Sequence, residues 1–483
     1  MPASESPSST RIVSAADFAL PVSEQSPSPS DQPAADLPST QSLIDSCVHC
    51  GFCLSTCPSY RVIGKETDSP RGRIYLMNGL SQDKFALTDE IVEHFDTCLG
   101  CLACVSTCPS GVEYDQLITT ARIQIEQNYQ RSLPQRLLRK VLFTLLPYPQ
   151  RLRPFLRPLQ IYQRTGLQKV LRQTRLLDRF LPKSLVAMES LLPPIQSQAF
   201  ADPELEIFPA QGQQRYRVGL ILGCIQRLFL SEVNQATIRV LTANGCEVVI
   251  PKGQGCCAAL PHHQGQVDQA QDLARQMIDS FADTELDAVI INASGCGHTL
   301  KEYDQILKED EGYCDRAQAF AHQVKDVQEF LDEIGLTTPL SPLQPEPLPV
   351  VYQDACHMLH GQKIQTQPRR LLQQIPGIAL REPRDAFLCC GSAGVYNILQ
   401  PEIAEELGQQ KVQNLTQTGA VLIASANVGC TMQIRKHLDA QDQVLPVLHP
   451  IQLLDFSIRG VAWSSADVGN AQDRHLISTS DAP

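Results

Sequence analysis

The sequence predicts a multi-domain protein in which an all-α, cysteine-rich module precedes two repeated α/β lobes with parallel sheets. Three observations carry this prediction. A four-cysteine pattern occurs twice in the first quarter of the chain, short apolar runs appear after residue 215, and landmarks in the second half recur at near-constant offsets. A chain of 483 residues is long enough for several domains.

The doubled cysteine pattern predicts two iron–sulfur clusters. Its copies, 51 residues apart, are Cys47-x-x-Cys50-x-x-Cys53-x-x-x-Cys57-Pro58 and Cys98-x-x-Cys101-x-x-Cys104-x-x-x-Cys108-Pro109. This is the run of two-cluster bacterial ferredoxins, in which the fourth cysteine ligates the other cluster. We therefore expect one [4Fe–4S] cluster on Cys47, Cys50, Cys53 and Cys108, and a second on Cys98, Cys101, Cys104 and Cys57.

Zinc sites and a disulfide framework are the alternatives for these cysteines. Structural zinc sites use Cys-x-x-Cys pairs, but not usually a doubled run of four that ends in proline.

The N-terminus lacks a basic segment followed by an apolar stretch, so no secretory signal is predicted and reduced thiols are expected. No apolar run approaches membrane-spanning length. We expect a cytoplasmic protein, either free or peripheral on the cytoplasmic face of the membrane.

The segments around the cysteine runs predict a helical ferredoxin module over residues 41–125. Residues 73–80 and 88–95 have apolar residues at helical spacing, with Thr88 as an N-cap. Residues 1–40 contain 17 Ser and Pro, which predicts a disordered tail.

Residues 126–212 are predicted to form a basic helical linker region, with short amphipathic helices broken by prolines. Between residues 121 and 200, 14 Lys and Arg face 3 acidic residues, so this segment carries +11 and the rest of the chain −23. The acidic remainder argues against general nucleic-acid binding. The basic helices are expected either to bind an anionic membrane surface or to expose their basic face to solvent, and the sequence favours neither alternative.

The second half predicts α/β layers. Short apolar runs at residues 217–222, 247–250, 288–292, 348–352 and 420–424 suit strands buried on both faces, and segments between several of them have helical patterning. Three cysteine positions recur in the same order at offsets of 132, 133 and 134 residues, which indicates a duplication. The pairs are Cys224 and Cys356, Cys256 and Cys389, and Cys296 and Cys430. We expect a first lobe over residues 213–340, a second over 346–460 and a flexible tail over 461–483.

Each lobe brings a cysteine, a Cys-Cys pair and a further cysteine to loops where open α/β sheets place ligands. These candidate metal sites are Cys224, Cys256, Cys257 and Cys296 in the first lobe, and Cys356, Cys389, Cys390 and Cys430 in the second. Cys246 and Cys314 lie outside the pattern and are expected to pack as small apolar residues.

No catalytic residue or nucleotide site is predicted. The stretch Gly253-x-Gly255-x-x-Ala258 matches a loose dinucleotide fingerprint, but Pro261 follows early and two cysteines occupy the loop. Five histidines near the cysteine loops are expected to act as hydrogen-bonding neighbours rather than ligands: His262, His263, His298, His357 and His360.

These motifs resemble a known family. The doubled repeat containing Cys389-Cys390-Gly391 looks like the CCG domain of heterodisulfide reductase-type proteins. Together with the ferredoxin module it most resembles the iron–sulfur subunit of glycolate dehydrogenase (glycolate oxidase). The stretches that carry the resemblance are residues 223–227, 245–257, 354–362 and 388–397.

The resemblance implies a subunit of an oxidoreductase complex. In that family a separate FAD-binding flavoprotein oxidises glycolate to glyoxylate, and the iron–sulfur subunit passes the electrons to a quinone or another carrier. The architecture also resembles iron–sulfur subunits of D-lactate and anaerobic glycerol-3-phosphate dehydrogenases, and a heterodisulfide reductase-type thiol-redox protein remains a further alternative.

The chain departs from the full CCG motif, which ends in Cys-x-x-Cys. Here the two copies read Cys296-Gly-His-Thr299 and Cys430-Thr-Met-Gln433, and the first lobe has Cys-Cys-Ala in place of Cys-Cys-Gly. Each lobe therefore lacks a fifth cysteine. Four remain in each, enough for one ordinary cluster per lobe, so that one or two further clusters are allowed.

Overall fold

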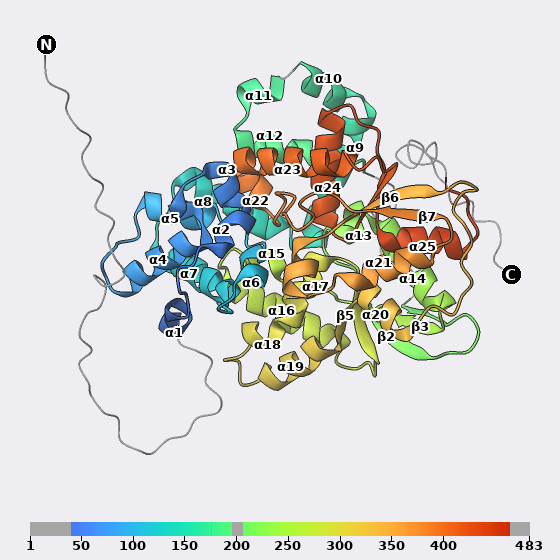
Figure 1. The fold of residues 1–483 in the computed structure, drawn as a ribbon. Coiled ribbons are helices and arrows are strands. Elements are labelled where there is room, and N and C mark those ends of the chain that lie inside the picture. The colour runs from blue at the N-terminus through green and yellow to red at the C-terminus, as the bar shows by residue number, and fades with distance from the viewer. Residues whose placement is uncertain (1–39, 175, 196–205, 464–483) are drawn as a thin grey trace, which may run out of the picture. The chain divides into compact units, whose positions relative to one another are not determined.

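The computed structural model describes residues 40–174, 176–195 and 206–463, which belong to one unit (Figure 1). Residues 1–39 of the tail expected over 1–40, and positions 464–483 of the expected C-terminal tail, lie outside the described residues, and Thr40 begins a helix. In the described part of residues 40–195, every regular element is a helix.

The first region contains seven α-helices and one 3₁₀ turn. They are α1 (Thr40–Asp45), α2 (Phe52–Thr56), α3 (Pro58–Ile63), η2 (Glu66–Asp68), α4 (Pro70–Ser81), α5 (Asp89–Asp96), α6 (Ala103–Thr107) and α7 (Tyr114–Asn128). The helices predicted over residues 73–80 and 88–95 are confirmed as α4 and α5. Thr88 caps α5, because its side-chain oxygen accepts a hydrogen bond from the Ile91 amide.

Each cysteine run folds as a tight loop followed by a five-residue helix. Gly51 and Leu102 adopt left-handed backbone conformations, with φ of 84° and 64°, immediately before α2 and α6. The two short helices lie against each other (Figure 1). Cys57 and Cys108 follow α2 and α6, so each fourth cysteine is separated from its own loop by a helix.

The linker forms five further helices: α8 (Leu133–Leu145), α9 (Pro149–Arg164), α10 (Leu167–Gln173), α11 (Leu176–Phe180) and α12 (Lys183–Ser190). The expectation that prolines break these helices is wrong at Pro154 and Pro158, which lie inside α9. Both prolines are exposed. Water can therefore satisfy the carbonyls that lose their amide partners, which lowers the cost of an internal proline.

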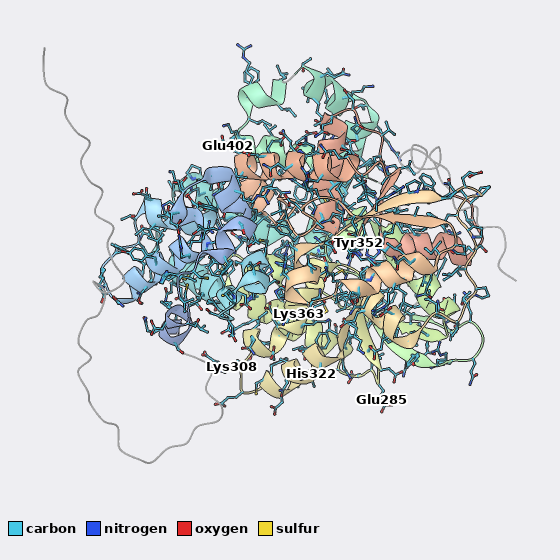
Figure 2. All side chains as sticks on the ribbon, viewed as in Figure 1. Glu285, Lys308, His322, Tyr352, Lys363 and Glu402 are labelled. Carbon is cyan, nitrogen blue, oxygen red and sulfur yellow. The ribbon has the colours of Figure 1, made fainter. Side chains whose placement is uncertain are left out.

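Buried side chains of the linker pack on both lobes. Phe143 of α8 contacts the cluster around Ile398, and Leu156 of α9 packs with Phe229. Lys183 of α12 donates to Glu402, which is labelled in Figure 2.

The two lobes contain separate sheets with one strand order in common. The first lobe has β1 (Ile207–Phe208), β2 (Tyr216–Ile221), β3 (Cys246–Val249), β4 (Ala288–Ile291) and β5 (Val324–Asp326), in the order β1-β3-β2-β4-β5. The second has β6 (Leu348–Gln353), β7 (Ile378–Arg381), β8 (Leu422–Ser425) and β9 (Val447–Leu448), in the order β7-β6-β8-β9. All pairs are parallel except the added edge pair of β1 with β3.

The five strands predicted from apolar runs are confirmed within two residues at each end. Helices connect the parallel strands: α13 (Gln226–Phe229), α14 (Ser231–Ala243), α15 (Ala259–His262), α16 (Val267–Phe281), α17 (Ser294–Lys301), α18 (Tyr303–Ile306), α19 (Cys314–Gln323), α20 (Val327–Ile334), α21 (Thr366–Gln374), α22 (Tyr396–Leu399), α23 (Pro401–Thr416) and α24 (Val428–Ala440). A last helix, α25 (Pro450–Ile458), follows β9. A π-helical turn spans His357–Gly361.

The largest core joins the two lobes. Leu241 of α14, Leu371 of α21 and Leu454 of α25 belong to one buried cluster, together with inward residues of both sheets such as Tyr352, labelled in Figure 2. Helices α14 and α25 pack against each other at this junction (Figure 1). Burying apolar surface from both repeats in one core holds the two lobes together.

Candidate iron–sulfur sites

The first cavity lies between the two cysteine loops of the helical region. Its lining includes Cys47, Cys50, Cys53 and Cys108, together with Cys104. Cys50 is exposed, and the neighbouring Val48 and Phe52 side chains are 67% and 63% exposed. The four cysteines assigned to one cluster from the sequence therefore border one space, which reaches the molecular surface.

The second cavity is lined by the other four cysteines, Cys57, Cys98, Cys101 and Cys104. All four are buried. Since Cys57 comes from the first run and the rest from the second, the crossed assignment matches the lining of both cavities. Four thiols around each space are the donor set that [4Fe–4S] clusters use, so the residues fit the group.

Positive charge surrounds Cys98. Burial alone disfavours its thiolate, but Arg73, Arg122 and the Gly100 amide outweigh this effect and lower the pKa of Cys98. The Gly100 amide donates to Cys98 Sγ over 3.4 Å, and the hydroxyl of Tyr114 lies 3.7 Å from the same sulfur. This loop is arranged to stabilise negative sulfur.

In the first lobe the four predicted cysteines come together. Cys224 Sγ lies 3.4 Å from Cys256 Sγ, and Cys257 interacts with both Cys256 and Cys296. Hydrogen bonding from Cys256 and Cys296 lowers the pKa of Cys257 well below its ordinary value. The buried hydroxyl of Tyr303 is close to these thiols and has no hydrogen-bond partner among the described residues. An orphaned donor beside three of these thiols fits a bound group that offers acceptor atoms.

The second lobe repeats this arrangement. Cys356 Sγ lies 3.9 Å from Cys389 Sγ, and Cys390 interacts with both Cys389 and Cys430. The Asn427 side-chain amide donates to Cys430 Sγ over 3.4 Å. Lys411 brings a buried positive charge next to this site. Its side chain is 2% exposed, and its ammonium donates to the carbonyls of residues 386 and 388, just before Cys389.

Hydrogen-bonded polar residues occupy the two positions where the CCG motif has its fifth cysteine. Thr299 is buried, and its hydroxyl lies 3.4 Å from His263 Nε2. Gln433 is also buried, accepts from the Asn397 amide and donates to the Ala404 carbonyl, both over 3.0 Å. Both side chains are integrated into the local packing.

The lobe 2 site contacts the second cavity. Cys101 and Cys389 belong to one buried cluster, and Cys356 packs against it. The Tyr396 hydroxyl donates to the Thr97 carbonyl over 3.0 Å. The first lobe contacts the same loop through Arg122, which donates to the Cys98 and His263 carbonyls. Both lobes thus meet the loop that begins at Cys98.

The histidines near the cysteine loops gather at this junction. The rings of His263, His298 and His357 lie with centroids 4.8–6.5 Å apart. Burial lowers the pKa of each of the three. His360 Nδ1 lies 2.9 Å from the Ser106 hydroxyl, and its Nε2 lies 3.1 Å from the Phe387 carbonyl. His262 packs against His263, with 5.5 Å between ring centroids.

The remaining sequence observations have clear positions. All eighteen cysteines are free thiols; Cys246 is buried within β3 and Cys314 begins α19. The Gly253–Ala258 loop leads into α15, a helix of four residues, and its two cysteines are buried. Among the described residues, no helix is both long and apolar enough to cross a bilayer.

No cluster of three or more His, Cys, Asp and Glu suited to a single metal ion occurs in the described ranges.

Sequence reasoning missed the buried cations Arg73, Arg122 and Lys411. Arg73 is wholly buried in α4 and borders the second cavity. A charged residue on the otherwise buried face of an amphipathic helix was the available signal, because such a charge requires partners.

Comparison with known protein families agrees with these sites. Residues 43–112 match the family described as 4Fe-4S dicluster domain, and residues 218–301 and 350–435 each match the cysteine-rich CCG domain. Residues 134–192 match the family described as glycolate oxidase iron-sulfur subunit, linker region. The protein is therefore an iron–sulfur protein with a dicluster domain and a duplicated CCG domain.

Two glycolate oxidase relatives match over most of the chain, and a third relative matches over half of it. The probable glycolate oxidase iron-sulfur subunit of Bacillus subtilis is 38% identical over 82% of this chain and 89% of its own length. The glycolate oxidase iron-sulfur subunit of Escherichia coli is 34% identical over 80% of this chain and 89% of its own. Lactate utilization protein A of Bacillus subtilis is 27% identical over 50% of this chain. The chain belongs to the family of glycolate oxidase iron–sulfur subunits.

Proposed function

We propose that this protein is the electron-transfer subunit of a glycolate dehydrogenase (glycolate oxidase) complex. The observation that carries the proposal is similarity, over about four fifths of this chain, to two glycolate oxidase iron–sulfur subunits, combined with two cavities that each gather at least four cysteines. A separate FAD-binding subunit oxidises glycolate to glyoxylate and supplies the electrons.

The ligand assignment follows the cavities. Cys47, Cys50, Cys53 and Cys108 hold the first [4Fe–4S] cluster, and Cys57, Cys98, Cys101 and Cys104 hold the second. When bound, such clusters supply one-electron transfer without proton chemistry. The chain's residues orient the thiolates, bury the four thiols of the second cavity and supply the cations that stabilise negative sulfur. The exposure of Cys50 leaves the first cavity accessible to a partner.

Each CCG lobe holds one further cluster on its four cysteines. The lobe 1 set is Cys224, Cys256, Cys257 and Cys296, and the lobe 2 set is Cys356, Cys389, Cys390 and Cys430. The orphaned Tyr303 hydroxyl and the buried Lys411 support this assignment. Thr299 and Gln433 at the fifth positions disfavour the five-cysteine, non-cubane type.

The helical region corresponds to an all-α ferredoxin-like module over residues 41–125. A basic helical linker region spans 126–212, except that β1 within this range joins the sheet of the first lobe, and the CCG lobes span 213–340 and 346–460. The absence of strands from the described part of residues 40–195 supports the all-α ferredoxin-like module. The strand order that the two sheets share supports the two repeated CCG lobes.

The acceptor is a quinone or another carrier, and the protein works in the cytoplasm or peripherally on the membrane. The linker supports a membrane contact because it combines excess basic charge with exposed apolar side chains, including Phe155 (51%), Ile161 (63%) and Phe180 (72%). Sedimentation with anionic and with zwitterionic vesicles tests this contact. Binding to anionic vesicles alone supports it, and failure to bind either assigns the basic face to solvent.

The substrate assignment is tested by expressing the chain with its flavoprotein partner. Dye reduction is measured with glycolate, D-lactate and glycerol 3-phosphate. We expect glycolate to give the highest rate and omission of this chain to abolish transfer to the natural acceptor. Activity with glycerol 3-phosphate or D-lactate alone would overturn the glycolate assignment.

A further inference from the structure

One arginine lies wholly buried beside the second cavity. Arg73, on α4, is 0% exposed and lines the cavity with Cys57, Cys98, Cys101 and Cys104. Its guanidinium stays protonated at every physiological pH. A permanent positive charge therefore lies next to four buried thiols.

Three hydrogen bonds orient this guanidinium. Nε donates to the His94 carbonyl over 2.6 Å, and Nη2 donates to the hydroxyls of Ser59 and Thr97, each over 3.0 Å. Nη1 is buried and has no hydrogen-bond partner among the described residues. A buried, unpaired donor of a charged group is costly. An acceptor is expected beside it, and the cavity is the place next to Arg73 that the protein leaves open.

The charge of Arg73 is only partly balanced. Its nearest carboxylate is that of Asp68, whose side chain is 4% exposed and whose Oδ1 lies 3.8 Å from Nη2. The same oxygen also accepts from the Thr97 hydroxyl over 2.7 Å and lies 3.0 Å from His94 Nδ1. Asp68 therefore divides its negative charge among three partners.

We propose that Arg73 raises the reduction potential of the cluster held by Cys57, Cys98, Cys101 and Cys104. This inference rests on the ligand assignment proposed above. Reduction adds one electron from the flavoprotein and neither forms nor breaks a bond, so a fixed positive charge favours the reduced form. The effect is large where solvent screening is weak, and the unpartnered Nη1 would be available to donate a hydrogen bond to a bound cluster.

Arg71 offers a matched control two positions away. It lines the first cavity, but its Nε is paired with Glu66 over 2.7 Å and its side chain is 30% exposed. Solvent and Glu66 therefore screen its charge. Arg71→Gln is expected to leave the potential of the second cluster unchanged.

The experiment is a mediated redox titration of the full chain, followed by EPR, on wild type, Arg73→Gln, Arg73→Lys, Asp68→Asn and Arg71→Gln. In Arg73→Gln the reduced-to-oxidised ratio of one cluster should fall at least tenfold at fixed potential, equivalent to about 59 mV for one electron. Arg73→Lys should restore most of the ratio. Asp68→Asn removes a negative charge and should shift the same cluster in the opposite direction.

Opposite shifts distinguish charge from damage, because misfolding would not raise the potential in one variant and lower it in the other. The proposal is overturned if Arg73→Gln retains both clusters with unchanged potentials, or if Asp68→Asn shifts the potential downward or not at all. If Arg73→Gln fails to assemble its clusters, the direction in which Asp68→Asn shifts the reduction potential decides whether the proposal stands. Fewer than two reducible clusters in wild type would contradict the ligand assignment instead.

Discussion

His357 Nε2 lies 2.8 Å from the carbonyl oxygen of Gly100, within hydrogen-bonding distance. His357 follows Cys356 of the lobe 2 site, and Gly100 lies between Cys98 and Cys101 of the second cavity. One hydrogen bond thus links a CCG cysteine loop to a ferredoxin cysteine loop. Its place beside the packed Cys101 and Cys389 makes it part of the structure that fixes the distance between the two sites.

Replacing His357 with phenylalanine should loosen this link. The variant loses one hydrogen bond, worth about 1 kcal/mol, and leaves the Gly100 carbonyl without its partner. Thermal loss of the iron–sulfur visible absorbance should begin a few degrees lower than in wild type. His357→Gln, which retains a side-chain donor, should recover part of the loss. His322→Gln, at an exposed position on α19 labelled in Figure 2, should have no effect.

The crossed ligand sets predict which cysteines act together. Cys57→Ala should remove the same EPR signal as Cys98→Ala, and Cys108→Ala the same signal as Cys47→Ala, because each pair lines one cavity. Each variant should lose about four irons per chain. If Cys57→Ala and Cys47→Ala removed the same signal, the crossed assignment would be wrong.

Iron content tests the CCG sites. With one cluster in each lobe, wild type should contain about sixteen irons per chain, and Cys257→Ala or Cys390→Ala should each remove about four. These cysteines interact with two others in their sets, so their loss should abolish binding. Cys314→Ser, outside both sets, is the control. About eight irons in wild type would mean that only the ferredoxin pair is filled.

His449 predicts an acid-sensitive helix end. Its Nδ1 accepts a hydrogen bond from the Ile451 amide over 3.0 Å and caps α25, which requires an unprotonated ring nitrogen. Burial lowers the pKa of His449 to about 3, below the ordinary value of 6.5. Its contribution is therefore complete above pH 6.5 and is lost as the pH falls from 6.5 toward 3.

Hydrogen exchange of α25, corrected for intrinsic rates, measures this effect. Between pH 7 and pH 5 the opening free energy of wild type should fall by about 2 kcal/mol more than that of His449→Asn, which retains a capping acceptor but does not titrate. Equal pH dependence in the two proteins would exclude His449 as the titrating group.

Much of the architecture was predictable because its signals are local. The strand at Leu348–Gln353 and the helix at Asp89–Asp96 were expected from an apolar run and from helical spacing. Strand β7 was missed, and none of its residues is fully buried, so it lacks the continuous apolar signature. The prediction that prolines break the linker helices was wrong at Pro154 and Pro158, because the sequence does not show that these two positions of the helix are exposed.

The sequence alone determined the cysteine runs, the duplication and the family resemblance, because spacing along the chain dictates which thiols share one loop. Only the tertiary structure decided that Cys101 packs with Cys389, that His357 meets Gly100, and that Arg73 is wholly buried with one nitrogen unpaired. These contacts join segments far apart in the chain. They depend on how helices and lobes pack, which no local pattern encodes.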